Sequence, residues 1–163
     1  MLTRITAAVE AARLDPQAGR DRLGELWNEA AGDPFHRCTI AHYLADLQDE
    51  TEDELTWDLR ALEAANAVTD EQVRQIDHSL QVESLLPSLH LNLADDYRRL
   101  GLPDEARHHL ETASAHLGVL ASDASSSNDT NASYGALIRG ALDRVATALA
   151  EGSTARLETN PST

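Results

Sequence analysis

The stretch LHLNLADDYRRLGLPDEARHHL, residues 89–110, has the most regular pattern in this chain of 163 residues. Apolar residues recur at three- and four-residue intervals on both sides of Gly101 and Pro103, as in two helices joined by a tight turn. Ala94 and Ala106 are small enough to let the two helices approach closely. Tyr97 supplies a large side chain to the neighbouring packing layer. The stretch therefore predicts an antiparallel helix pair.

This spacing resembles the tetratricopeptide repeat, in which each unit is a helix pair of about 34 residues. The resemblance covers residues 87–118, and a weaker copy covers residues 33–65, where Ala41 matches Ala94. Because one pair cannot bury its own apolar face, stacked neighbours are expected. The resemblance implies an all-α fold of antiparallel helix pairs, stacked as a short solenoid of seven or eight helices.

Several helix starts can be placed from local signals. An aspartate that can cap a helix is followed twice by a proline suited to the first turn, at residues 15–16 and 33–34. Thr51 with Glu54 predicts a capping box for a fourth helix, and Thr69 with Gln72 predicts one for a fifth helix near residues 70–80.

The rest of the chain fits a single domain over residues 1–151. Residues 121–133, ASDASSSNDTNAS, have the composition of a flexible loop. The following apolar pattern predicts a closing helix over residues 132–151 that caps the stack. Residues 152–163 are expected to form a disordered tail.

Composition narrows the function. Hydrophobic residues make up 42% of the chain and aromatic residues only 4%, which favours helices packed through Leu, Ala, Val and Ile. The formal charge of −15 disfavours nucleic acid and anionic membranes as partners, and favours a basic protein or peptide. Because no stretch is apolar enough to cross a bilayer or to act as a signal region, we expect a cytoplasmic protein.

The resemblance also implies where a ligand would bind. Tetratricopeptide arrays take peptides in a concave groove lined by the first helix of each pair. Asn92 stands five residues before Tyr97, where some family members use an asparagine to hold a ligand's main chain or terminal carboxylate. The positions that match the groove are Leu91, Asn92, Asp95 and Arg98 in the better unit and Arg37, Thr39, His42 and Asp46 in the weaker one.

Catalytic and metal-binding signals are few. The adjacent carboxylates of Asp95 and Asp96 point different ways on a helix, and Cys38 lies in an apolar stretch that favours packing over reactivity. Glu105-x-x-His108 has the spacing of carboxylate-bridged metal sites, but no second copy is present. We therefore expect no cofactor and no catalytic residue, and expect the histidines to face solvent.

These observations favour a non-catalytic interaction module, an adaptor or regulatory scaffold whose groove binds a peptide or helix. The alternative is a small helical enzyme that binds a metal or a small molecule through His, Asp and Glu side chains. Homodimer formation is left open, because an incomplete array can pair its apolar faces with a second copy.

Overall fold

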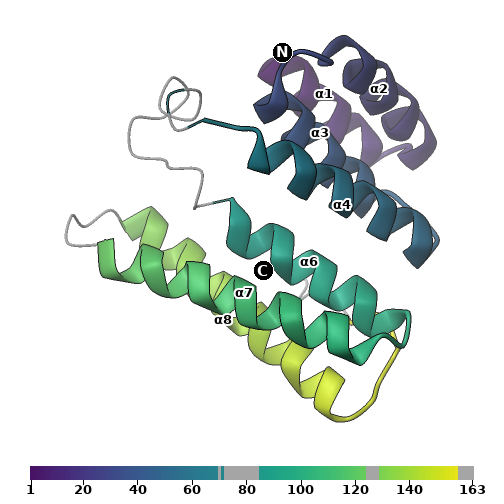
Figure 1. The fold of residues 1–163 in the computed structure, drawn as a ribbon. Coiled ribbons are helices and arrows are strands. Elements are labelled where there is room, and N and C mark those ends of the chain that lie inside the picture. The colour runs from purple at the N-terminus through teal and green to yellow at the C-terminus, as the bar shows by residue number, and fades with distance from the viewer. Residues whose placement is uncertain (70, 72–84, 124–128, 158–163) are drawn as a thin grey trace.

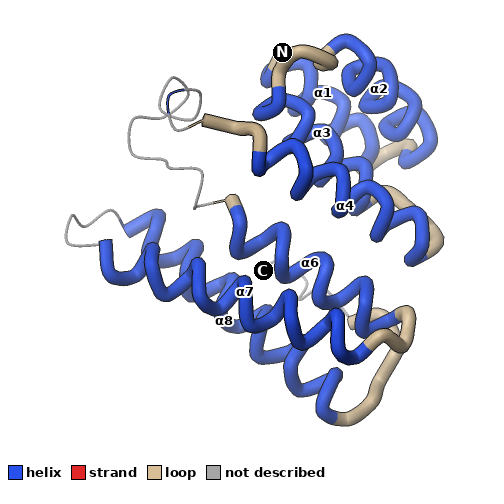
Figure 2. Tube along the Cα trace, in the orientation of Figure 1, coloured by secondary structure: helices blue, strands red, loops and turns tan. Residues whose placement is uncertain are grey.

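A computed structural model describes residues 1–69, 71, 85–123 and 129–157, and it leaves the side chains of 118–123 and 129–133 undescribed. This part of the chain holds seven α-helices and no strand (Figures 1 and 2), so the fold is all-α, as the sequence predicts. The helices are α1 (Leu2–Ala12), α2 (Pro16–Glu29), α3 (Pro34–Asp46), α4 (Thr51–Asn66), α6 (Leu86–Arg99), α7 (Pro103–Asp123) and α8 (Asp129–Ala150).

Consecutive helices pack as pairs, α1 with α2, α3 with α4 and α6 with α7. Short turns join the two helices of each pair, and the pairs follow one another in layers (Figure 1). The N-terminal layers meet the C-terminal ones where α4 packs against α6, and α8 packs on both α6 and α7. The closing helix thus covers the last pair, as expected from its apolar pattern.

Two of the expected caps are present and one is not. The carboxylate of Asp15 accepts a hydrogen bond from the Ala18 N–H at 3.1 Å, and that of Asp33 accepts one from the His36 N–H at 3.0 Å. The capping box at residues 51–54 is wrong, because Glu50 is the N-cap of α4 and makes no side-chain cap bond. Thr51 and Glu54 instead bond to an arginine of another helix.

The core consists of three apolar clusters that run along the stack. Alanines occupy the closest helix crossings: Ala41 and Ala61 are fully buried between α3 and α4, and Ala94 and Ala106 are fully buried between α6 and α7. The small residues predicted to let α6 and α7 approach therefore lie where that approach occurs. At the crossing of α1 and α2, Gly19 does the same against Ala12.

Two glycines with positive φ redirect the chain at helix ends. Gly101 (φ 72°) ends α6, and its N–H donates to the Arg98 carbonyl at 3.1 Å. Gly152 (φ 68°) ends α8 with an equivalent bond to the Leu149 carbonyl at 3.0 Å. In both turns the next N–H also reaches back into the last helical turn, which is the Schellman arrangement that satisfies helix carbonyls. Gly152 directs the following residues back toward α6.

Two predicted flexible segments need correction, and one predicted helix lies outside the described residues. Part of the loop predicted over residues 121–133 is helical instead, because α7 continues to Asp123 and α8 begins at Asp129. The tail predicted to be disordered from residue 152 is packed against the fold through residue 157. The fifth helix predicted near residues 70–80 lies outside the described residues apart from residue 71.

Candidate functional site

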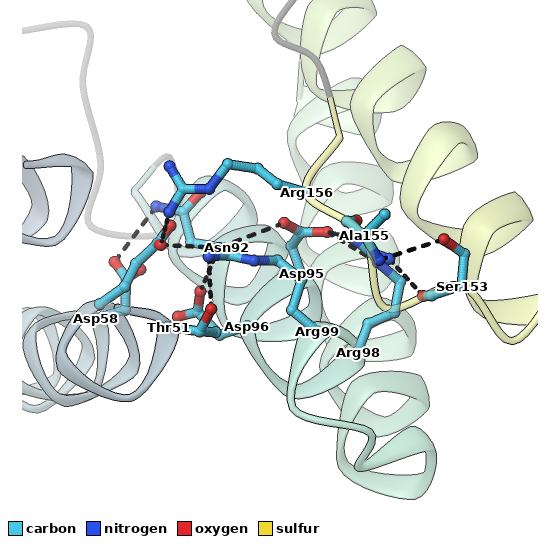
Figure 3. A network of polar contacts seen from close by, with 11 residues as sticks. Thr51, Asp58, Asn92, Asp95, Asp96, Arg98, Arg99, Ser153, Ala155 and Arg156 are labelled. Atoms are coloured by element: carbon cyan, nitrogen blue, oxygen red, sulfur yellow. Dashed lines mark hydrogen bonds and ion pairs between the residues drawn. The ribbon is translucent and has the colours of Figure 1, made fainter. Parts of the chain in front are cut away.

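The segment that follows α8, residues 152–157, lies across α6 and is here called the docked segment. The guanidinium of Arg98 donates to the carbonyl oxygen of Ser153 at 2.5 Å and to that of Ala155 at 2.8 Å (Figure 3). The main chain bends at Ala155, whose N–H donates to the Ser153 hydroxyl at 3.4 Å. Because a guanidinium carries several N–H donors in one plane, Arg98 can reach both carbonyls. Arg98 therefore holds the main chain of this segment.

Arg98 is also held by its own helix. Its side chain is only 1% exposed, and the Asp95 carboxylate accepts from its Nε at 2.9 Å and from its Nη2 at 2.7 Å. This bidentate pair neutralises the buried charge and sets the plane of the guanidinium. The remaining N–H groups are thereby aimed at the docked segment.

A second contact binds the docked segment by charge. Arg156 donates to the Glu54 carboxylate of α4 at 2.6 Å, and Arg99 of α6 donates to the same carboxylate at 2.7 Å. Arg99 also donates to the Thr51 hydroxyl at 2.6 Å. Arg98 and Arg99 diverge from adjacent positions, one toward Ser153 and Ala155 and the other toward Thr51 (Figure 3). Glu54 thus receives one arginine from the fold and one from the segment.

The docked segment has an apolar contact at its end. Leu157 packs against the cluster formed by α6, α7 and α8, which includes Leu142 and Val145. A shallow pocket of about 330 Å³ lies beside it, lined by Asp143, Arg144, Thr147, Ala148, Glu151 and Leu157. The segment is therefore held at three places: two carbonyls, one arginine and one leucine.

Beneath this face, two carboxyl groups are buried between α4 and α6. Asp58 and Asp96 are each 1% exposed. Burial raises the pKa of both, and the charge of Asp96 raises that of Asp58 further. Among the described residues, the Oδ2 atom of each has no hydrogen-bond partner. A proton carried by either carboxyl would let the two oxygens bond to each other.

Polar side chains of α3 and α6 complete the surroundings of this pair. The Asn92 amide donates to the Asp58 carboxyl at 3.3 Å and lies 3.3 Å from the Nδ1 atom of His42. Arg99 lies 3.5 Å from the carboxylate of Asp96 and partly compensates its charge. The junction of α4 and α6 is therefore polar at the end nearest the docked segment.

The histidines do not face solvent as a group. His90 and His109 lie between α6 and α7 with their Nδ1 atoms 2.8 Å apart, and Tyr97 and His116 stack on the two rings. Burial lowers the pKa of His90 to about 4 and lowers that of His109 as well. The expectation of solvent-facing histidines is wrong for this set, which forms part of the α6–α7 packing. In the described ranges, no three His, Cys, Asp or Glu side chains are grouped so that they could hold a metal ion.

Cys38 is packed, as its apolar neighbourhood predicts. It is 5% exposed in the cluster between α3 and α4, and burial raises the pKa of its thiol to about 12. The thiolate that nucleophilic chemistry requires is therefore strongly disfavoured.

The predicted groove residues fall into two groups. His42, Asn92, Asp95 and Arg98 lie together around the docked segment and the buried carboxyl pair, and Asp46 is exposed at the end of α3 within electrostatic reach of His42 and Arg156. The others have structural contacts: Leu91 belongs to the α6–α8 core, Arg37 stacks on the Trp27 ring at 3.9 Å, and the Thr39 hydroxyl bonds to the Phe35 carbonyl.

Sequence reasoning missed Glu54, Asp58 and the docked segment as parts of this site, and it did not predict that Asp96 and Arg99 join a buried cluster. Glu54 fits a cap by its spacing from Thr51, and no local signal distinguishes Asp58 from an exposed helix aspartate. One available signal was Gly152, since a glycine directly after an apolar helix commonly turns the chain back.

Neither a protein-family model, nor a curated protein, nor a solved structure matches the chain. Across the part of the chain that the structure describes, none of the helices is both long and apolar enough to cross a membrane.

Proposed function

We propose that the chain is a tetratricopeptide-like, non-catalytic interaction module that binds a protein segment on the face formed by α4 and α6. The single observation that supports this most is Arg98, which is buried, fixed by Asp95 and bonded to two main-chain carbonyls. A side chain arranged in this way suits recognition of a peptide main chain.

Charge supports a basic ligand. The face presents Glu54 and Asp46 to the arginine of the docked segment, within a chain that has 28 acidic and 13 basic residues. Such a surface speeds the encounter with a basic segment more than it raises affinity. Because these charges are partly exposed, apolar contacts such as that of Leu157 supply much of the binding free energy.

A catalytic role has less support from the geometry. The two carboxyl groups with strongly raised pKa values are each 1% exposed beneath the face, where a substrate would not reach them. Their position between α4 and α6 suits a structural contact between two layers of the stack.

Selection from a random linear peptide library displayed on phage would test the proposed function. The chain and its Arg107→Ala variant should enrich peptides that contain Arg or Lys, whereas Arg98→Ala should not. Arg107 is a matched control because it is an exposed arginine paired with Asp104 on α7. Equal enrichment on Arg98→Ala and on the unaltered chain would contradict the proposal, as would enrichment of acidic peptides.

A further inference from the structure

The docked segment meets three chemical requirements of the face at once. Arg98 needs carbonyl acceptors, Glu54 accepts a cation, and the α8 cluster takes an apolar side chain. The side chains of residues 154 and 155 are exposed, so these contacts set no side-chain requirement there, and the main chain bends at Ala155. The face therefore recognises a short pattern: two main-chain carbonyls, then a basic residue that is directly followed by an aliphatic residue.

We propose that residues 153–157 occupy the binding site of a partner segment with this pattern. They leave the face when the partner binds. The inference rests on the proposed function and adds two things to it. It specifies the ligand as a short stretch with Arg-Leu or a close equivalent, and it makes the chain's own segment a competitor for the site.

The docked segment is suited to leaving, because little of the core depends on it. The side chains of residues 154–156 are exposed, and only Leu157 packs against an apolar cluster. When the segment departs, Arg98 keeps its bidentate partner Asp95, and Glu54 keeps Arg99. Neither Arg98 nor Glu54 therefore loses its charged partner within the fold.

The tether gives the docked segment an advantage over a free peptide. A segment joined to α8 by a short turn has an effective concentration on the order of millimolar. If it occupies the face about nine-tenths of the time, a free ligand must bind to the remaining tenth, and its apparent Kd rises about tenfold. Weakening the docked segment alone should therefore tighten the binding of a free ligand.

The test uses the full chain and a fluorescently labelled peptide, EGSTARL, which has the sequence of residues 151–157. In the Arg156→Glu variant the docked segment would place a carboxylate beside Glu54. We expect fluorescence anisotropy to show that this variant binds EGSTARL about tenfold more tightly than the unaltered chain does. The matched control is Arg139→Glu, which makes the same change of charge at an exposed site on α8 and should bind like the unaltered chain.

A second peptide, EGSTAEL, allows two ligands to be compared on one protein, so that a difference in folding between protein variants cannot account for the result. It should bind the Arg156→Glu variant at least tenfold more weakly than EGSTARL, because it removes the cation that meets Glu54. Equal binding of the two peptides would overturn the ligand pattern. Equal affinity of Arg156→Glu and Arg139→Glu for EGSTARL would overturn the competition.

These outcomes can be told apart from failure of the proposed function. If the phage selection yields basic peptides that need Arg98 but bind Arg156→Glu and the unaltered chain equally, the face binds partners and the competition is wrong. If it yields none, the proposed function fails. Light scattering adds one more outcome: a dimer of the unaltered chain that Arg156→Glu abolishes would mean that a second copy's segment occupies the face, which also overturns the proposal.

Discussion

Helices α1–α4 meet through apolar and small side chains, whereas α4 meets α6 partly through charged ones. In the first region, buried leucines and alanines fill the crossings and Asp-Pro pairs begin two of the helices. In the second, a cluster of carboxyl and guanidinium groups occupies the end nearest the docked segment. The apolar region requires only shape, while the polar junction requires that each buried charge has its partner. The first can therefore serve as a rigid support for the second.

The largest effect is expected in the polar junction, at Arg98. Changing Arg98→Ala leaves the Asp95 carboxylate without its bidentate partner and releases the docked segment. We expect the free energy of unfolding to fall by about 3 kcal/mol, measured by urea denaturation. Arg107→Ala removes an exposed arginine and should change it by less than about 0.5 kcal/mol. Similar values for the two variants would mean that Arg98 is not part of the fold's support.

The second-largest effect is expected in the apolar region, at the crossing of α1 and α2. A Cβ atom on Gly19 would lie 2.3 Å from the Cβ atom of Ala12, so Gly19→Ala must push the two helices apart. We expect a loss of about 2 kcal/mol in unfolding free energy. Gly24→Ala is the matched control on the same helix, where nothing lies within 4 Å. It should stabilise the chain by up to about 1 kcal/mol, because alanine favours helix. Effects of the same sign would contradict this account of the crossing.

Much of the helix packing outside the polar junction could be predicted from the sequence, because its signals are local. The helix pair at residues 87–118, the alanines at its crossing, the turn at Gly101 and the caps at Asp15 and Asp33 depend on neighbours a few residues away. Gly19 was not singled out, since a lone glycine inside a helix looks the same whether or not another helix approaches it. Only the structure shows that Ala12 lies against it.

The polar junction could not be predicted, because its contacts join distant residues. Glu54 pairs with Arg99 and with Arg156, which are 45 and 102 residues away. Asp58 resembles any solvated helix aspartate until α6 covers it with Asn92 and Asp96. The sequence also predicts a disordered tail from residue 152, whereas contacts to Arg98, to Glu54 and to the cluster that includes Leu142 hold residues 153–157 in place.

The carboxyl pair should make the stability of the polar junction depend on pH. The pKa of Asp58 is raised to about 9 and that of Asp96 to about 7, from an ordinary value of 3.8. A raised folded-state pKa means that the folded chain holds protons that the unfolded chain releases, so stability falls as pH rises from about 4 to about 9.

Asp58→Asn should remove most of this dependence, since an amide can donate to Asp96 without ionising. We expect the variant to match the unaltered chain near pH 4 and to exceed it by about 2 kcal/mol at pH 9, measured by urea denaturation across that range. Asp143→Asn, at an exposed position on α8, serves as the control and should follow the unaltered chain at every pH. A stability difference that does not change with pH would argue against a shared proton.

The smallest effect concerns the helix starts. Asp15→Ala removes the acceptor of the Ala18 N–H and should cost about 1 kcal/mol of unfolding free energy. Glu50→Ala removes an N-cap side chain that makes no cap bond, and should cost much less. Thermal unfolding followed by circular dichroism can rank the two variants. An equal loss of unfolding free energy would mean that the hydrogen bond from the Ala18 N–H to Asp15 does not stabilise the chain.

The most direct test of the central claim, that Arg98 holds the main chain of the docked segment on this face, is the mobility of that segment. Thr154 is exposed, so a spin label attached to a Thr154→Cys variant should be tolerated, and the buried Cys38 thiol should stay unlabelled. Electron paramagnetic resonance should show a restricted line shape at this site in the otherwise unaltered chain and in Arg107→Ala. In Arg98→Ala the line shape should narrow to that of a mobile segment. The same restricted line shape in all three proteins would contradict the claim.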